Sequence, residues 1–323
     1  MKPSFIITID TEGDNLWGRY DEITTRNSGY LPQFQQLCER FGFKPTWLTN
    51  YEMAMDPAYV EFARDVIARG SGEIGMHLHA WNSPPVIALT RDDMRHHPYL
   101  IEYPDNVMRD KIAFMTELLE ARFGVKMLSH RAGRWAFDQR YARLLIEFGY
   151  IADCSVTPGV SWQAQLGSAD GAGGTDYRHF PRAPYYLDRE DISRAGNSPL
   201  LEVPMTTRPS QLAALFPPSY SIPGVRSIAH RLAPAVRWLR PNGRNLRDML
   251  YLVRQAIREG SRHIEFMLHS SELMPGGSPT FRQDADIEKL YRDLEQLFPA
   301  IAADFVGATL SGFALQYQQR AQQ

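Results

Sequence analysis

The order in which buried strands and amphipathic helices follow one another restricts the fold of this chain more than any other feature. Apolar, β-branched stretches at residues 4–10, 44–49 and 73–76 alternate with helical patterns at residues 29–41 and 57–69. Further strands are expected at 125–130, 149–155, 200–203, 263–268 and 305–308, and further helices at 105–123, 138–148, 246–258, 284–298 and 312–319. This alternation is typical of a parallel sheet whose strands are joined by crossover helices.

The size and charge of the chain limit the classes of protein to which it can belong. Its 323 residues suit one large α/β domain or two modest ones, and we expect a single domain over residues 1–323 with an insertion around 157–245. The formal net charge of −2 provides no bulk attraction for nucleic acid. No stretch has the pattern of a membrane span or of a signal peptide, so we expect a cytoplasmic protein.

Two pairs of side chains that commonly bind metals follow two of the expected strands. Asp10 and Glu12 come at the end of the first strand, and His77 and His79 come just after the third. Residues two apart in an extended chain point to the same side, so each pair could reach one ion. Taken singly, the first pair could instead be a solvated acidic turn, and the second could be hydrogen-bonded loop histidines.

Other chemically useful side chains lie at the carboxyl ends of further expected strands. They are Arg131, Asp153 and His269. In a β/α barrel this edge of the sheet is the catalytic face. Two imidazoles and one carboxylate make a three-ligand site with an open position, as in catalytic zinc centres, where the ion polarises a carbonyl and lowers the pKa of bound water. A separate carboxylate can take a proton from water, and a separate histidine can protonate a leaving amine.

Five stretches between residues 8 and 269 resemble, in order, the motifs of the NodB-type polysaccharide deacetylases, carbohydrate esterase family 4. They are Thr8–Asp10, Glu73–His77, Arg131–Trp135, Asp153–Ser155 and Leu268–His269. The resemblance implies a deformed (β/α) barrel with fewer than eight units and long loop insertions. It also implies metal-dependent removal of an acyl group from an amino sugar.

The resemblance implies a role for each matching residue. Asp10 corresponds to the catalytic base, and Arg131 to the residue that pairs with this base. His77 corresponds to a metal ligand. His269 corresponds to the general acid, and Asp153 to the carboxylate that supports it.

The sequence departs from the family pattern at three positions. Thr11 stands where a second aspartate is usual, and we expect Glu12 to replace it as a metal ligand. Trp81 stands where the second histidine is usual, and we expect His79 to replace that ligand, with Asp14 or His130 as the alternatives. Gly133 stands where a proline is common. These departures resemble divergent members associated with bacterial surface-polysaccharide biosynthesis.

The expected function is that of a metal-dependent N-deacetylase acting on an amino sugar carried on a nucleotide or lipid phosphate. Zinc is the first choice of metal, although N/O ligands also suit Fe, Co or Ni. We expect Trp81 and Trp135 to line the substrate groove, although Trp135 could instead be a core residue. A basic amphipathic helix at 225–240 would pack on the body or contact an anionic carrier or membrane surface. The alternatives are a non-catalytic carbohydrate-binding relative and a deformylase or amidase on the same scaffold.

Overall fold

The computed structural model describes residues 2–18, 22–165, 167–168, 173–210 and 236–321. Within these residues, most strands form one curled sheet in the order β10-β1-β2-β3-β4-β5-β7-β6, with β11 also paired to β1. The strands are β1 Ser4–Thr11, β2 Thr46–Thr49, β3 Glu73–Leu78, β4 Ser129–Ala132, β5 Ala152–Asp153, β6 Tyr185–Tyr186, β7 Leu201–Glu202, β10 His263–His269 and β11 Val306–Ala308. All neighbours are parallel except β6 and β7.

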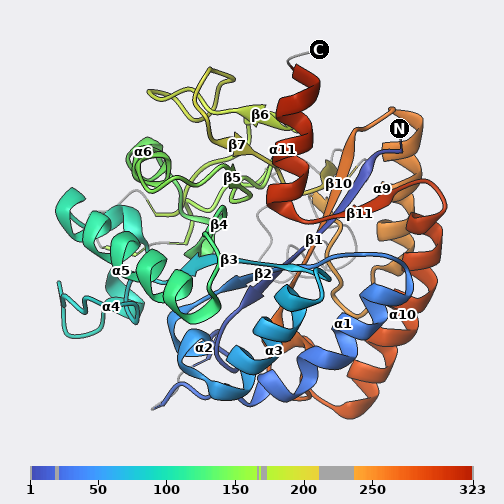
Figure 1. Cartoon of the computed structure of the whole chain (residues 1–323), viewed down its shortest axis with the longest axis horizontal. Helices are drawn as coiled ribbons and strands as arrows, with labels where there is room; N and C mark the ends of the chain where they lie inside the picture. Colours follow the sequence, from blue (N-terminus) through green and yellow to red (C-terminus); the bar gives the residue numbers. More distant parts are fainter. Residues whose placement is uncertain (1, 19–21, 166, 169–172, 211–235, 322–323) are drawn as a thin grey trace, which may run out of the picture.

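Helices surround these strands on the outside (Figure 1). They are α1 Leu31–Arg40, α2 Tyr51–Met55, α3 Pro57–Ala68, α4 Asp93–His96, α5 Asp105–Phe123, α6 Gln139–Glu147, α9 Leu246–Arg258, α10 Asp284–Ala302 and α11 Leu310–Ala321. Short 3₁₀ turns are η1 Arg26–Tyr30, η2 Leu100–Glu102, η3 Gly133–Trp135 and η4 Ser270–Leu273. No described helix is long and apolar enough to cross a membrane.

The alternation of side chains along β1 divides the core into two parts. Phe5, Ile7 and Ile9 pack in the large core shared with the outer helices, where Phe5 contacts Phe298 of α10 edge-on. Ile6 points the other way and joins a smaller cluster that includes Phe313 of α11. Since residues two apart share a face, Asp10 lies on the same face as Ile6, at the opposite end of the strand from α11. That end of the sheet is therefore left for polar side chains.

The structure confirms the expected deformed (β/α) barrel. β10 and β6 stand at the two ends of the strand order, so backbone pairing in the described residues does not close the sheet into a full barrel. The long segment after β5 contributes β6 and β7 to this sheet, and a separate antiparallel pair, β8 Thr207–Pro209 with β9 Val236–Trp238.

Two of the expected elements differ in the structure. The strand predicted at 125–130 is β4, which begins only at Ser129 and pairs with β3 from His130 onward. The preceding Leu128 carbonyl accepts hydrogen bonds from backbone N–H groups next to β5. Most of the helix predicted at 225–240, residues 225–235, lies outside the described residues. Its last residues are wrong as a helix, because Val236–Trp238 is strand β9, held by pairing to β8.

Candidate active site

The register of the sheet brings the predicted site residues together. Asp10 of β1 pairs with His269 of β10, and His77 of β3 pairs with Arg131 of β4. All these positions lie at the carboxyl ends of parallel strands, so their side chains meet at one edge of the sheet. The structure therefore brings the side chains of Asp10, His77, Arg131 and His269 to this edge.

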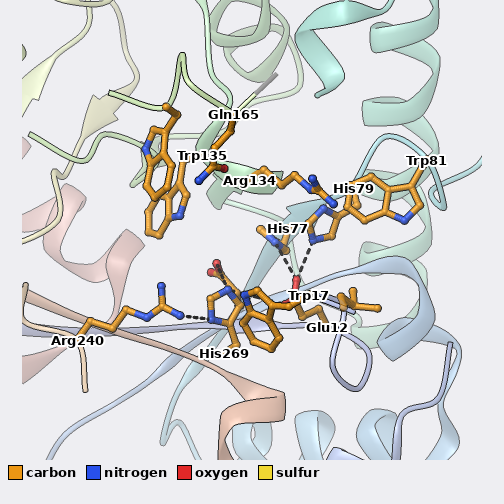
Figure 2. Close-up of a pocket in the computed structure, with 13 residues that line it drawn as sticks. Glu12, Trp17, His77, His79, Trp81, Arg134, Trp135, Gln165, Arg240 and His269 are labelled. Atoms are coloured by element: carbon orange, nitrogen blue, oxygen red, sulfur yellow. Dashed lines mark hydrogen bonds and ion pairs between the residues drawn. The ribbon is translucent and has the colours of Figure 1, made fainter. Parts of the chain in front are cut away.

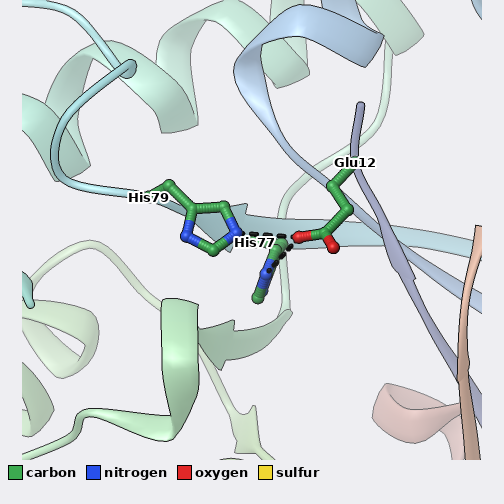
Figure 3. Close-up of side chains that lie close together, drawn as sticks. All are labelled: Glu12, His77 and His79. Carbon is green, nitrogen blue, oxygen red and sulfur yellow. Dashed lines mark hydrogen bonds and ion pairs between the residues drawn. The ribbon is translucent and has the colours of Figure 1, made fainter. Parts of the chain in front are cut away.

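The donor atoms of Glu12, His77 and His79 converge on one point at this edge (Figure 3). One ligand atom from each residue lies within 4.8 Å of the others, and all three residues are buried. Glu12 Oε2 is 2.8 Å from His79 Nε2 and 3.6 Å from His77 Nε2. A carboxylate and two imidazoles in this arrangement can hold a divalent cation and leave further positions for water or substrate.

A hydrogen bond from one ring nitrogen of His77 leaves the other nitrogen available to bind a metal. Its Nδ1 lies 2.9 Å from the backbone carbonyl oxygen of Arg131, which can only accept, so Nδ1 carries the proton. Nε2 is then the basic nitrogen, and it faces Glu12. A histidine ligand whose other nitrogen donates to a carbonyl is the usual supporting arrangement in metal sites.

The ionisation of the other two donors also fits a cation. Burial alone raises the pKa of Glu12, but His269, His77 and His79 together hold this pKa well below its usual value, so Glu12 is a carboxylate. Burial lowers the pKa of His79 to about 4, assisted by the charges of His77 and Arg134, so His79 is neutral at physiological pH. Its Nδ1 is buried without a hydrogen-bond partner among the described residues, so His79 lacks the support that His77 has.

Asp10 is held beside these donors by Arg131. Arg131 is fully buried, and its Nη1 donates to Asp10 Oδ1 at 2.6 Å. Its Nη2 lies 2.6 Å from both Thr8 Oγ1 and Glu265 Oε1. Burial raises the pKa of Asp10, yet Arg131, His77 and His269 keep that pKa below its ordinary value. Asp10 is therefore a fixed, ionised carboxylate, able to accept a proton.

His269 lies across from Asp10 and Glu12. Its Nε2 is 3.7 Å from Asp10 Oδ2 and 3.8 Å from Glu12 Oε1. Its Nδ1 is turned away from these carboxylates, toward Glu272 Oε2 at 3.1 Å. One ring nitrogen of His269 therefore faces the site and the other faces a second carboxylate.

A scan against family models and a search of curated proteins both find no match. Among solved structures, a proposed polysaccharide deacetylase from Mycobacterium smegmatis matches with a TM-score of 0.53 and 16% identity, over 99% of this chain and 92% of that one. A proposed glycoside hydrolase/deacetylase from Parabacteroides distasonis matches with a TM-score of 0.62 and 10% identity, over 98% and 72% of the two chains. The chain has the polysaccharide deacetylase fold.

This deacetylase fold is not confined to deacetylases. A GH57 branching enzyme from Thermococcus kodakaraensis matches with a TM-score of 0.55 and 12% identity, over 98% of this chain and 72% of that one. At such identities the likenesses establish the fold, and the activity has to be argued from the site itself.

One predicted contact of the deacetylase motifs is not formed. Asp153 was expected to support His269, but it accepts a hydrogen bond from His130 Nδ1 at 2.6 Å and from Ser155 at 2.9 and 3.0 Å. Its place in the register explains this, because β5 pairs Asp153 with His130 of β4, away from β10. This expectation is corrected, and the partner of His269 is Glu272.

A cavity of about 360 Å³ opens onto these groups in the deacetylase fold (Figure 2). It is lined by Asp10, Glu12, Leu16, Trp17, His77, His79, Trp81, Arg134, Trp135, Trp162, Gln165, Arg240 and His269. Trp81 and Trp135 are among the lining residues, and Trp135 is at the same time a nearly buried member of the large core. The rings of Trp135 and Trp162 are parallel, with centroids 6.5 Å apart, and Arg134 lies 4.9 Å above the ring of Trp81.

Several residues of this site were not predicted from the sequence. The Trp17 ring lies edge-on to the His269 ring, with centroids 4.7 Å apart, and Trp162 comes from the long segment after β5. Neither follows an expected strand, so no pattern marked them. Glu272 could have been noticed, because it follows His269 by three residues. At this spacing a glutamate at the start of a helical turn can accept a hydrogen bond from the backbone N–H of the residue three before it.

Proposed function

We propose that this protein is a metal-dependent N-deacylase that acts on an N-acyl amino sugar. The observation that carries the proposal is the meeting of three groups at one cavity: the Glu12–His77–His79 donor set, the Asp10–Arg131 pair and His269. A cation site, a base and an acid are the parts that hydrolysis of an amide requires.

Each group has a part in the proposed reaction. Asp10 takes a proton from the attacking water, and Arg131 fixes the direction of its carboxylate. A divalent cation, when bound, polarises the acyl carbonyl. As the C–N bond breaks, His269 donates a proton from Nε2 to the leaving nitrogen, so the products are a carboxylate and a free amino sugar. Acid and base catalysis are each typically worth about 10²–10⁴ in rate.

The walls of the cavity support a sugar as the substrate. Trp81 and Trp135 contribute apolar ring surface to the lining, with Arg134 over the ring of Trp81 and Arg131 over that of Trp135. Gln165 and Arg240 offer hydrogen-bond donors in the same cavity. Pyranose rings have apolar faces and polar edges, so such a mixed lining suits them. In the full proposal the sugar is a cytoplasmic intermediate of a bacterial surface polysaccharide, such as an O-antigen or capsule, carried on a nucleotide or lipid phosphate, and the metal is Zn²⁺.

The test combines metal content with turnover. Wild type, His77→Ala and His79→Ala are compared by elemental analysis after reconstitution with zinc. We expect close to one ion per chain in the wild type and loss of the ion in both variants. Retention in His79→Ala would move the third ligand elsewhere, and a wild type that binds no ion would defeat the catalytic proposal.

Asp10→Asn separates chemistry from metal binding. The variant keeps the shape of the side chain and leaves the donor set intact, so the metal content should be unchanged. Because the amide cannot accept the proton, release of acetate from N-acetyl amino sugars should fall at least about 10²-fold. A fully active Asp10→Asn variant would contradict the assignment of the base.

A carbohydrate-binding protein without hydrolytic activity is the second candidate. The observation that favours it is the unsupported Nδ1 of His79, because ligands without an outer partner bind metals less tightly. Saturable binding of an amino sugar, without release of any acid, would favour this candidate. Mass analysis of the released acid separates acetate from formate and so distinguishes a deacetylase from a deformylase.

A further inference from the structure

Glu272 is bonded to His269 at two points. It lies on η4, the turn that follows β10, and is almost fully buried. Its Oε2 accepts the backbone N–H of His269 at 2.9 Å and lies 3.1 Å from Nδ1 of the same residue. The two contacts fix both the position of the backbone and the rotation of the ring.

Arg240 completes this cluster from the segment that follows β9. Its Nη2 lies 3.3 Å from both carboxylate oxygens of Glu272 and 3.0 Å from His269 Nδ1. Burial raises the pKa of Glu272, but Arg240 and His269 lower it to about 2, so Glu272 is ionised. An ionised carboxylate can only accept hydrogen bonds.

Two arrangements of the His269 ring are compatible with these distances. Nδ1 can carry a proton and donate it to Glu272, or it can be bare and accept from Arg240. A hydrogen bond from Nδ1 to a buried carboxylate is charge-assisted, and it strengthens as the ring gains positive charge. In the first arrangement Arg240 cannot donate to Nδ1 and donates to the carboxylate oxygens of Glu272 alone, so Glu272 accepts hydrogen bonds from both His269 and Arg240.

We propose that Glu272, held by Arg240, is the positioning residue of His269, and that it fixes the proton on Nδ1 and directs Nε2 into the cavity. The inference rests on the proposed function, in which His269 is the acid. It gives Glu272 the part that the family resemblance assigns to Asp153. When Nε2 passes its proton to the leaving nitrogen, His269 becomes neutral, and the proton on Nδ1 stays there, in its hydrogen bond to Glu272.

Asp153 has other partners that exclude it from this part. It is bonded to His130 Nδ1, and His130 Nε2 lies 2.8 Å from the hydroxyl of Tyr141. Ser155 occupies further acceptor sites of the same carboxylate. Asp153 thus belongs to a buried chain of hydrogen bonds with His130 and Tyr141. Glu272, by contrast, contacts His269 directly.

The kinetic test uses the dependence on the leaving group. Glu272→Gln keeps the shape of the side chain and can still accept the backbone bond, but it removes the charge. An N-acetyl amino sugar has a poor leaving group that needs an acid, whereas para-nitrophenyl acetate has one that leaves without a proton. We expect kcat for the sugar to fall about 10²-fold with little change in KM, and hydrolysis of the ester to change less than about threefold.

Two further variants serve as controls. Asp153→Asn should keep the wild-type ratio of amide to ester rates, because its contacts do not reach His269. Glu259→Gln removes the charge of another carboxylate paired with an arginine, Arg208, and is the matched control for loss of a Glu–Arg pair. An altered ratio in Asp153→Asn, with a normal ratio in Glu272→Gln, would overturn the proposal.

A measurement without turnover keeps this inference separate from the proposed function. Ring ¹⁵N shifts of the metal-free protein report which nitrogen of His269 is protonated. We expect the proton on Nδ1 in the wild type and in Asp153→Asn, and a shift toward Nε2 in Glu272→Gln, where Arg240 is freed to donate to Nδ1. A bare Nδ1 in the wild type would contradict the inference, whether or not the protein hydrolyses any substrate.

Discussion

The single buried guanidinium of Arg131 forms ion pairs with two carboxylates at the base of the site. Arg131 pairs with Asp10 and with Glu265, each at 2.6 Å; Arg131 and Glu265 are fully buried, while Asp10 is almost fully buried at the edge of the cavity. One positive charge cannot neutralise two buried carboxylates at low cost. The pKa values separate accordingly: Asp10 lies below its ordinary value, while burial raises the pKa of Glu265 to about 7, with Asp10 adding to the rise.

This separation predicts how stability depends on pH. The folded pKa of Glu265 is about 7 and its ordinary value is 4.5, so the folded state holds the proton more tightly than the unfolded state. The corresponding stability is complete below about pH 4.5 and is lost as pH rises through about 7, by roughly 3 kcal/mol in total. Glu265→Gln keeps a neutral group at all pH values, so its free energy of unfolding should lack this decline.

Urea unfolding near pH 5 and near pH 8 measures the difference between the two proteins. The Glu265→Gln variant should gain on the wild type as pH rises between these points. Equal pH dependence in both proteins would show that Glu265 is ionised throughout, and that Arg131 stabilises both carboxylates equally.

At this scale the sequence predicted the residues better than their partners. Asp10 and His77 could be placed because each comes at or just past a recognisable strand end. The family resemblance predicted Asp153 as the carboxylate partner of His269, although Glu272 also lies near a strand end. The choice depends on which strand stands next to β10, and only the register of the whole sheet decides that.

At the scale of elements, the site depends on a close approach between β3 and β4. Gly133 begins η3 directly after β4, and a Cβ placed there would lie 2.4 Å from the carbonyl oxygen of Leu78 and 2.8 Å from His79 Nδ1. Both distances are shorter than any stable contact. The glycine found at the usual position of a proline therefore allows His79 to occupy its place beside Glu12.

Gly133→Ala should weaken metal binding without changing a ligand. The added methyl group must push His79 or the end of β3 aside, so we expect metal affinity to fall about tenfold or more, and stability to fall by about 1–3 kcal/mol. Isothermal titration with zinc gives the affinity. Gly29→Ala is the matched control, because a Cβ there meets nothing within 4 Å. Wild-type affinity in the Gly133→Ala variant would show that His79 is not a ligand.

The elements themselves were predictable in proportion to their length. The helices at α5 and α10 span 19 residues each, long enough to show a helical period, and both were expected near their observed positions. β9 has three residues, which are too few to show any period, and its sequence continues a helical pattern instead. Its strand conformation comes from pairing with β8, a contact that the local sequence does not encode.

At the scale of the whole molecule, the donor set joins parts of the chain that are distant in sequence. Glu12 follows β1, while His77 and His79 belong to β3 and the loop after it, with β2 between the two strands. In the absence of a cation, the pKa of His77 is raised despite its burial, because Asp10 and Glu12 favour its charged form. The folded protein thus brings Glu12 and His77 together at a point where a positive charge is favoured. A divalent ion, with its larger charge, should be bound there more strongly than a proton.

Metal binding should therefore stabilise the fold as a whole. An ion that binds the folded state, at about 100 times its dissociation constant, contributes about 2.7 kcal/mol, which for a chain of this size raises the melting temperature by roughly 5 °C. The measurement is thermal unfolding with zinc and with a chelator. His77→Ala should unfold at the same temperature under both conditions, because its donor set is incomplete. A rise in both proteins would place the stabilising ion elsewhere, whereas a rise in the wild type alone would tie the ion to the ends of β1 and β3.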